Sequence, residues 1–268
     1  MLGLGSSLNS LISLETEINH SLSFDGTNDF VDFTSAAFQS KLADSDANFK
    51  TSGSVSIWVR LNLTSTNAQL WDFAINTDNR IQLQYKHSGN EYNFTFKGGG
   101  TGKTAVFRPG SSHENDNIFH HIVCTWDKGD DNEMKIYVDG SLGATTGLAT
   151  VALVGDFDST ADSTQGPDGT GGVEILSGTS FNGSADLNAF LDDFVLYSDV
   201  LTLEEVNGLY NSGASDPSIY KEYDNMFAHW TFNEGTGTTV TDRVSAFVGT
   251  LGTGATAPTF STNNAQGQ

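Results

Sequence analysis

Apolar and polar residues alternate with a period of two over much of this chain. Between residues 119 and 142, one run has apolar residues at 122, 124 and 126, and a second has them at 134, 136 and 138. Period two indicates strands with one buried face. The polar residues 128–133 predict a hairpin loop, and Asp139–Gly140 favours the positive φ angles of a tight primed turn. We therefore expect a meander with one core face.

The same alternation predicts more strands on either side of this hairpin. We expect them at 54–62, 68–75, 79–86 and 91–97, with a strand, turn and strand at 21–33. Successive strands of this kind suit an antiparallel sheet that curves over a core. Residues 98–104 lack the first glycine of a phosphate-binding loop, so we interpret them as a glycine hairpin.

A short helix is predicted at 201–210, because Thr202 and Glu205 fit a capping box. The strand before this helix would have one face carrying Phe190, Asp192, Phe194 and Leu196. A carboxylate on an apolar face costs free energy unless it has partners.

Composition and charge limit the possible partners. A chain of 268 residues with 37% apolar residues can bury a full core, and a single large β-domain reaches this size. With 12 Lys and Arg against 33 Asp and Glu, the net charge is −21, which argues against nucleic acid or an anionic membrane surface as a partner. The acidic side chains either keep the protein soluble or hold a divalent cation.

Two segments do not follow the strand pattern. Residues 1–19 contain leucines spread among Gly and Ser, and this predicts an arm that needs a surface on which to bury them. They lack the basic start of a secretory signal, and no run approaches the roughly 18 apolar residues of a membrane span. Residues 155–172 are acidic and aperiodic; a metal-binding loop and a solvated surface loop both remain open.

Several segments resemble signatures of the laminin-G-like, concanavalin A-like sandwich domains. The segments are 119–142 (with His120, His121, Trp126, Asp127, Tyr137, Asp139 and Gly140), 21–33 (with Phe24, Asp25, Gly26, Asp29, Phe30 and Val31), Trp58–Val59, 181–197 and 201–210. Residues 228–242 resemble the opening strand of the family but stand after the helix. We therefore predict a permuted order in which 226–252 complete the sheets. A truncated second repeat is the alternative.

The predicted fold is an all-β, two-sheet antiparallel jelly-roll sandwich of the concanavalin A-like kind with one short helix. We divide the chain into an N-terminal arm at 1–19, the sandwich at 20–252 and a C-terminal tail at 253–268.

The chemistry of an enzyme is not found. Glycoside hydrolases need two carboxylates across a sugar ring, and no strand carries the closely spaced acidic run that sandwich hydrolases use. His120 and His121 are adjacent on a strand, so they point to opposite faces and cannot act together. We expect one to be packed and the other to be hydrogen-bonded, and we expect no catalytic activity.

Two binding functions follow from the resemblance. A carbohydrate could stack on Trp58, Trp71 or Tyr85, although each is also a natural core residue. Related sandwiches bind Ca²⁺, and the matching positions here are Asp192 as a side-chain ligand and the Asp25–Gly26 turn. The alternative for Asp192 is a hydrogen bond to backbone amides.

The opening of the chain and the permuted sandwich resemble structural proteins of marine bacteriophages. We therefore expect a non-catalytic virion protein assembled in the host cytoplasm, either a capsid decoration or a tail or fibre component. Its arm would bind capsid or tail proteins, it would form a homo-oligomer or lattice, and a host glycan is a possible ligand. The alternative is a Ca²⁺-dependent carbohydrate-binding module of a cell-surface or secreted system.

Overall fold

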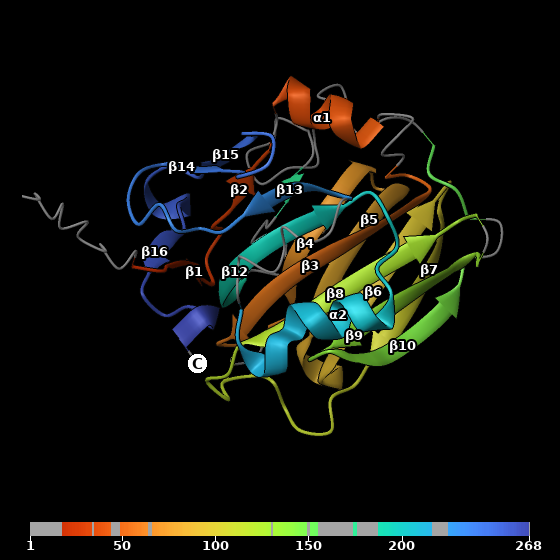
Figure 1. The fold of residues 1–268 in the computed structure, drawn as a ribbon, viewed down its shortest axis with the longest axis horizontal. Coiled ribbons are helices and arrows are strands. Elements are labelled where there is room, and N and C mark those ends of the chain that lie inside the picture. Colours follow the sequence, from red (N-terminus) through yellow and green to blue (C-terminus); the bar gives the residue numbers. More distant parts are fainter. Residues whose placement is uncertain are drawn as a thin grey trace, which may run out of the picture.

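The computed structural model describes residues 18–33, 35–43, 49–63, 66–129, 131–148, 151–154, 174–175, 187–215 and 225–267. Two large antiparallel sheets lie one behind the other, and a smaller sheet lies to one side of them (Figure 1). The predicted all-β sandwich is confirmed. Most of the arm at 1–19 and the acidic segment 155–172, with Asp156, Asp158, Asp162 and Asp168, lie outside the described residues.

The largest sheet contains eight strands. In spatial order they are β10 (Ser141–Gly147), β9 (Glu133–Val138), β8 (His120–Asp127), β3 (Ser52–Leu61), β12 (Asn188–Tyr197), β1 (Ser21–Asp25) and β16 (Thr259–Ser261), with β13 (Met226–Trp230) also paired to β12. Strands from both ends of the chain therefore meet on β12.

Two four-stranded sheets complete the β-structure. The larger one runs β4 (Ala68–Asn76), β5 (Asn79–Lys86), β6 (Glu91–Gly98) and β7 (Thr101–Phe107). The smaller one runs β11 (Glu174–Ile175), β2 (Val31–Asp32), β15 (Val248–Leu251) and β14 (Thr239–Thr241). The strands predicted at 54–62, 68–75, 79–86 and 91–97 are confirmed with small changes at their ends.

One apolar core lies between the eight-stranded sheet and β4–β7. Alternate residues of both sheets enter it, including Ile57 and Val59 of β3, Leu83 of β5, Phe94 of β6 and Trp126 of β8. Because side chains alternate across a strand, the intervening residues of β4–β7 point to the opposite face of that sheet.

Two α-helices are described. Helix α1 (Ala36–Ala43) buries Phe38 and Leu42, and helix α2 (Leu203–Tyr210) lies in front of the eight-stranded sheet in Figure 1. The capping box of Thr202 and Glu205 is confirmed at the start of α2. Short 3-10 turns occur at His87–Gly89, Asn211–Gly213, Gly254–Thr256 and Ala265–Gly267. No described helix is both long and apolar enough to span a bilayer.

The hairpin turns follow the local sequence. Asp139 and Gly140 both have positive φ angles, of 50° and 74°, as expected for the primed turn between β9 and β10. Gly99 and Gly100 also have positive φ angles and close the predicted glycine hairpin between β6 and β7.

The predicted face of β12 is wrong. The register against β3 shifts between Asp192 and Val195, and Asp193 adopts a left-handed φ of 42°. A β-bulge adds one residue to a strand and so reverses which residues face inward. Leu191 and Phe194 therefore both pack in the main core, while Phe190 packs in a separate cluster around Trp58.

The C-terminal strands belong to the same sheets as the rest of the chain. Strand β13 pairs with β12 from Phe194 to Tyr197, and β15 pairs with β2. Strand β16 pairs with β1, so part of the predicted tail at 253–268 extends the large sheet. The permuted order relative to the family stays a prediction.

Candidate functional site

The three aromatic residues predicted as stacking platforms are all buried. Trp58, Trp71 and Tyr85 each have 0% of their surface exposed. Trp71 packs against Phe73 and Phe94 in the core between the sheets. A ring without accessible surface presents no face to a sugar, so the structure does not match the predicted platforms.

Trp58 lies on the other face of the large sheet, under α2. Its ring stacks against His121 at 4.9 Å and against Tyr210 of α2 at 6.0 Å between centroids. Phe119, Ala265 and Tyr210 of α2 cover this face, so Trp58 is buried although it points away from the main core.

The predicted Ca²⁺ ligands do not come together. Asp25 lies opposite Asn188 on β12, four residues from Asp192, a separation of about 13 Å in extended chain. Asp192 is buried, and its two oxygens accept hydrogen bonds from the amides of Asp193 at 2.9 Å and Ala265 at 2.8 Å. Burial and the charge of Asp193 raise the pKa of Asp192 well above its usual value. Asp25, Gly26 and Asp192 therefore do not fit one Ca²⁺ ion, and the predicted alternative for Asp192 describes its contacts.

The next residue in the chain, Asp193, carries a second buried carboxylate. The bulge turns its side chain toward β13. Its Oδ1 lies 2.8 Å from Nε2 of His229, and Ser215 donates its hydroxyl to Oδ2. These side chains are inaccessible, with exposed fractions of 0% for Asp193 and 2% for His229. We interpret the group as a structural polar contact between β12, β13 and the segment after α2.

His120 and His121 occupy opposite sides of β8, as predicted. His121 is fully buried beside Trp58, and its Nε2 lies 2.8 Å from the hydroxyl of Ser56. Burial lowers the pKa of His121 to about 3, so it is neutral in the folded protein. His120 instead points toward the space between the sheets at their end.

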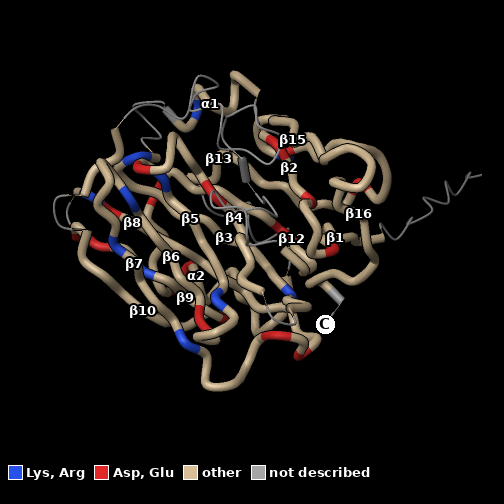
Figure 2. Tube along the Cα trace, turned by 180° about the vertical axis from the view of Figure 1, so that it is seen from behind, with Lys and Arg blue, Asp and Glu red and all other residues tan. Residues whose placement is uncertain are grey.

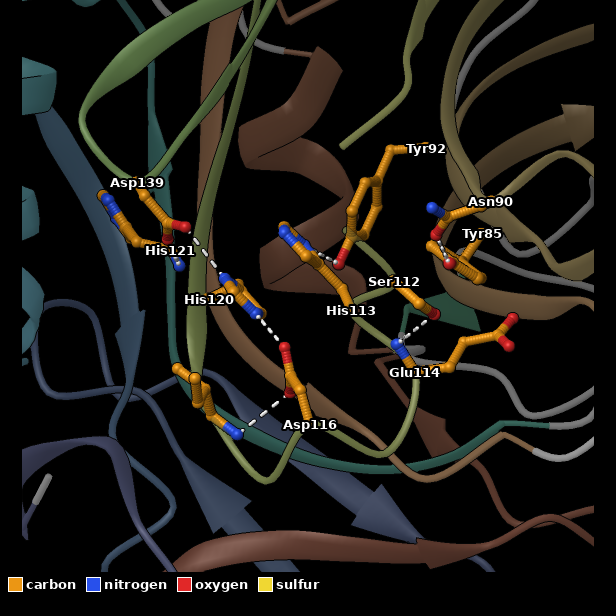
Figure 3. Close-up of polar contacts among 11 residues, drawn as sticks. Tyr85, Asn90, Tyr92, Ser112, His113, Glu114, Asp116, His120, His121 and Asp139 are labelled. Atoms are coloured by element: carbon orange, nitrogen blue, oxygen red, sulfur yellow. Dashed lines mark hydrogen bonds and ion pairs between the residues drawn. The ribbon is translucent and has the colours of Figure 1, made fainter. Parts of the chain in front are cut away.

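A histidine–carboxylate cluster lies at this end of the sandwich and consists of His113, Asp116, His120 and Asp139 (Figure 3). His120 Nδ1 lies 2.8 Å from Asp139 Oδ2, and its Nε2 lies 2.8 Å from Asp116 Oδ2. The His113 ring stacks on His120 with centroids 3.5 Å apart and planes 1° from parallel. His113 Nδ1 also lies 3.2 Å from the hydroxyl of Tyr92.

Backbone contacts hold this cluster in place. Residues 108–119 connect β7 to β8, and Glu114 forms an isolated bridge with Leu61 at the end of β3. Asn115 and Asn117 have φ angles of 55° and 62°, which Asn adopts more readily than most residues. Asp139 Oδ1 accepts from the amide of His121 at 3.0 Å, so the β9–β10 turn is tied to β8.

The charges within the cluster are complementary. Burial would lower the pKa of His120, but its hydrogen bonds to Asp139 and Asp116, and their charges, raise it overall. Burial and the neighbouring His120 lower the pKa of His113 to about 4. A protonated His120 between Asp116 and Asp139 can thus stack on a neutral His113.

A second polar region covers the outer face of β4–β7, toward the viewer in Figure 2. Since Ile81 and Leu83 enter the core, their neighbours on β5 point outward. The pairing aligns four polar residues across the strands: Asp72, Gln82, Thr95 and Thr104. Such a polar row is unusual for strands that are as buried as β4.

Three acceptor residues on this face have unpaired oxygens. Both carboxylate oxygens of Asp72, Oε1 of Gln82 and Oδ1 of Asn93 are buried without a hydrogen bond. We call these three residues the acceptor row. Arg80 lies 3.9 Å from Asp72, beyond hydrogen-bond distance. Burial raises the pKa of Asp72 to about 7, although the charge of Arg80 acts in the opposite direction.

Unpaired buried acceptors cost free energy, and in native proteins they often mark a place where a ligand or water donates hydrogen bonds. A ligand rich in hydroxyl groups would supply donors for these oxygens. Asp72, Gln82 and Asn93 were not predicted from the sequence as ligand-binding residues. The available signal was the polar side of the alternation in 79–97, which by itself predicts only a solvated face.

Comparison with known families identifies the kind of domain. Residues 25–207 match the sequence model of a family described as the concanavalin A-like lectin/glucanases superfamily. No match was found among curated proteins.

Solved structures share the fold at low sequence identity. A protein from Bacteroides ovatus, described as a candidate carbohydrate-binding protein, has a TM-score of 0.58 at 14% identity, covering 94% of this chain and 61% of that one. This chain therefore spans 61% of that protein's length. A heptameric SAP-like pentraxin from Limulus polyphemus has a TM-score of 0.44 at 12% identity, covering 72% of this chain and 82% of that one. The first likeness supports the fold alone, and the second is too weak to carry an argument.

Proposed function

The chain belongs to the concanavalin A-like lectin/glucanase superfamily, and from this premise we propose that it is a non-catalytic carbohydrate-binding domain. One observation carries the proposal: buried acceptor oxygens of Asp72, Gln82 and Asn93 on the outer face of β4–β7 accept no hydrogen bond. Because each of these oxygens is buried, a sugar hydroxyl reaches it only when the groups that cover it move on binding. The hydroxyl would then donate to the oxygen and remove the cost of leaving it unpaired. The proposed site is this sheet face instead of the buried rings of Trp58, Trp71 and Tyr85.

The charge of this face suits a neutral or acidic glycan. By strand alternation Arg80, Lys86 and Lys97 point to the same side as Asp72, within a chain whose net charge is −21. Lys97 is held by the carbonyl of Thr77 at 2.7 Å and by Asp78 at 3.0 Å. The face therefore does not share the acidic excess of the chain, and carboxylate or sulfate groups on a glycan would not be repelled from it.

A glycan array with the purified full chain tests the proposal, followed by calorimetric titration of any hit. Gln82→Ala and Asn93→Ala should each weaken binding, and Ser141→Ala on the exposed strand β10 is the matched control. Flat binding across neutral and acidic glycans, or equal affinities for all three variants, would contradict the assignment of this face.

The absence of catalysis is part of the same proposal. The acceptor row contains one carboxylate, whereas glycoside hydrolysis needs two across the sugar ring. Incubation with a panel of β-glucans, galactans and chitin should release no reducing ends. Release from any of them would overturn this part of the proposal.

A second candidate function is a structural role in a virion, as a capsid decoration or a tail or fibre component that displays the sandwich. The supporting observation is the leucine-containing segment 1–19, whose apolar side chains have no counterpart in the strand pattern. Apolar surface buried on a neighbouring subunit contributes roughly 25 cal/mol per Å². A chain lacking residues 1–19 should fold but fail to join the particle. Normal incorporation of that truncated chain would refute the role of the arm.

A further inference from the structure

The histidine–carboxylate cluster offers a set of ligands for a metal ion. His113, His120 and Asp139 each provide one ligand atom, and these atoms all lie within 4.8 Å of one another. His113 in the β7–β8 connection lies seven residues before His120, the first residue of β8, and Asp139 comes from the β9–β10 turn. The fold thus brings together two imidazoles and a carboxylate at one end of the sandwich (Figure 3).

We propose that His113, His120 and Asp139 form a binding site for one divalent transition-metal ion, with Zn²⁺ as the expected ion. Two imidazoles and one carboxylate suit Zn²⁺, Ni²⁺ or Cu²⁺, whereas Ca²⁺ and Mg²⁺ prefer sites built from oxygen ligands. Three protein ligands leave a fourth tetrahedral position for water.

Movements of the side chains would complete the site. Metal–ligand bonds of about 2.0–2.1 Å place two tetrahedral ligands about 3.3 Å apart. Separations of up to 4.8 Å would therefore contract by at most about 1.5 Å, and the 2.8 Å between His120 Nδ1 and Asp139 Oδ2 would widen by about 0.5 Å. The rings of His113 and His120 are stacked 3.5 Å apart between centroids and 1° from parallel. Because an imidazole binds a metal ion in its own ring plane, one ring must turn about its side-chain torsions before both nitrogens face one ion. The two rings are largely buried, with exposed fractions of 8% and 7%.

The surrounding groups can orient the ligands. We assign the metal-binding role to the His120 nitrogen that faces Asp139, while the nitrogen facing Asp116 keeps its proton and donates to that carboxylate. Asp116 Oδ1 also accepts from the amide of Ile118 at 3.0 Å, which fixes the carboxylate for this purpose. A carboxylate that accepts from the second nitrogen of a ligating histidine is a common feature of zinc sites. Asp139 Oδ1 likewise accepts from the His121 amide and leaves Oδ2 for the ion.

The electrostatics favour a dication. The cluster contains the carboxylates Asp116 and Asp139, and the only described basic group within hydrogen-bond reach of both is His120. A bound dication would balance the two carboxylates while both histidines act as neutral ligands. The proposal is independent of the sugar-binding face, because none of the acceptor row belongs to the cluster.

Titration of the metal-free full chain with Zn²⁺, followed by calorimetry, tests this site. We expect one ion per chain and a higher melting temperature with Zn²⁺, but no comparable effect of Ca²⁺ or Mg²⁺. Co²⁺ in place of Zn²⁺ should give the visible absorption of a tetrahedral site with nitrogen and oxygen ligands.

Two variants and a matched control assign the ligands. His113→Phe keeps a flat ring for stacking on His120, and Asp139→Asn keeps a residue that tolerates the φ of 50° and can still accept from the His121 amide. Each should weaken Zn²⁺ binding by at least about 10-fold. His87→Gln alters a nearby histidine that pairs with Glu114 at 2.8 Å, and it should leave the affinity unchanged.

Circular dichroism and melting curves establish that each variant is folded before its affinity is compared. If His113→Phe does not fold, the Asp139→Asn variant and the Co²⁺ spectrum of the unmodified chain decide the question. The proposal is overturned by the absence of saturable Zn²⁺ binding, or by affinities in the two ligand variants equal to that of the control.

Discussion

Replacement of Asp72 by Asn should make the protein more stable at neutral and alkaline pH. Asp72 is 4% exposed, neither of its carboxylate oxygens is hydrogen-bonded, and the nearest basic atom, on Arg80, is 3.9 Å away. Burial disfavours the charged carboxylate and raises the pKa of Asp72 from 3.8 to about 7. Asn has almost the same shape and cannot ionise.

The magnitude and its pH dependence follow from this pKa. The difference of about 3 pKa units corresponds to at most about 4 kcal/mol, since one unit is about 1.4 kcal/mol. Because the folded pKa is raised, the stabilising effect of the neutral carboxyl is fully present below about pH 4 and is lost as the pH rises through about 7. The Asn amide also lacks partners, so we expect Asp72→Asn to gain about 1–4 kcal/mol at about pH 8 and less at about pH 5.

Urea denaturation monitored by tryptophan fluorescence at the two pH values measures this gain. Asp78→Asn is the matched control, because Asp78 lies in the β4–β5 turn and its side chain is 62% exposed. Loss of its surface pair with Lys97 should cost no more than about 1 kcal/mol. A destabilised Asp72→Asn variant at about pH 8, or an equal gain at both pH values, would refute the reasoning. A stabilised variant that also binds glycan less tightly would show that Asp72 is retained for binding at the expense of stability.

Three further predictions concern core packing, a turn and Ca²⁺. Trp58→Ala should destabilise the protein by about 3–5 kcal/mol in chemical denaturation because it empties a buried volume under α2; a change below about 1 kcal/mol would contradict this packing. Gly140→Ala should lower the melting temperature more than Gly99→Ala. Both glycines have positive φ angles, but only a Cβ at Gly140 would meet a neighbour, the Tyr210 side chain at 2.9 Å. Equal shifts in melting temperature would argue against this contact. Added Ca²⁺ should leave the melting temperature of the metal-free chain unchanged because both oxygens of Asp192 already accept amide hydrogen bonds, and a clear increase would restore the predicted Ca²⁺ site.

The local sequence determines the strands, their turns and the helix. Alternation over 79–97 is sufficient to predict β5 and β6, because period two is a property of the extended chain and needs no distant contact. The positive φ angles at Asp139–Gly140 and the capping box at Thr202 likewise depend on neighbouring residues alone. The sandwich arrangement of these strands was predicted from the resemblance to the family.

The tertiary structure decided which faces of the strands are buried. Alternation shows that Trp58 points away from Val59, but only the packing of Tyr210, Phe119 and Ala265 around Trp58 shows that both sides of β3 are buried. The bulge at Asp192–Asp193 reverses the predicted inward face of β12, and it is visible only in the pairing with β3. A sequence pattern cannot register an extra residue that is defined by the partner strand.

The candidate sites also depend on contacts between distant segments. His120 and Asp139 stand out in the sequence as parts of a family signature, but His113 lies in an aperiodic connection and gives no local signal. Asp72 looks like any polar residue in an alternating strand until its burial and its unpaired oxygens are known. Local chemistry is fixed by residue type, whereas burial, the pKa and the set of ligands depend on which strands and loops the fold brings together. The sequence by itself therefore determined the strands, the turns and the kind of domain, and the tertiary structure decided which polar side chains are buried and brought together.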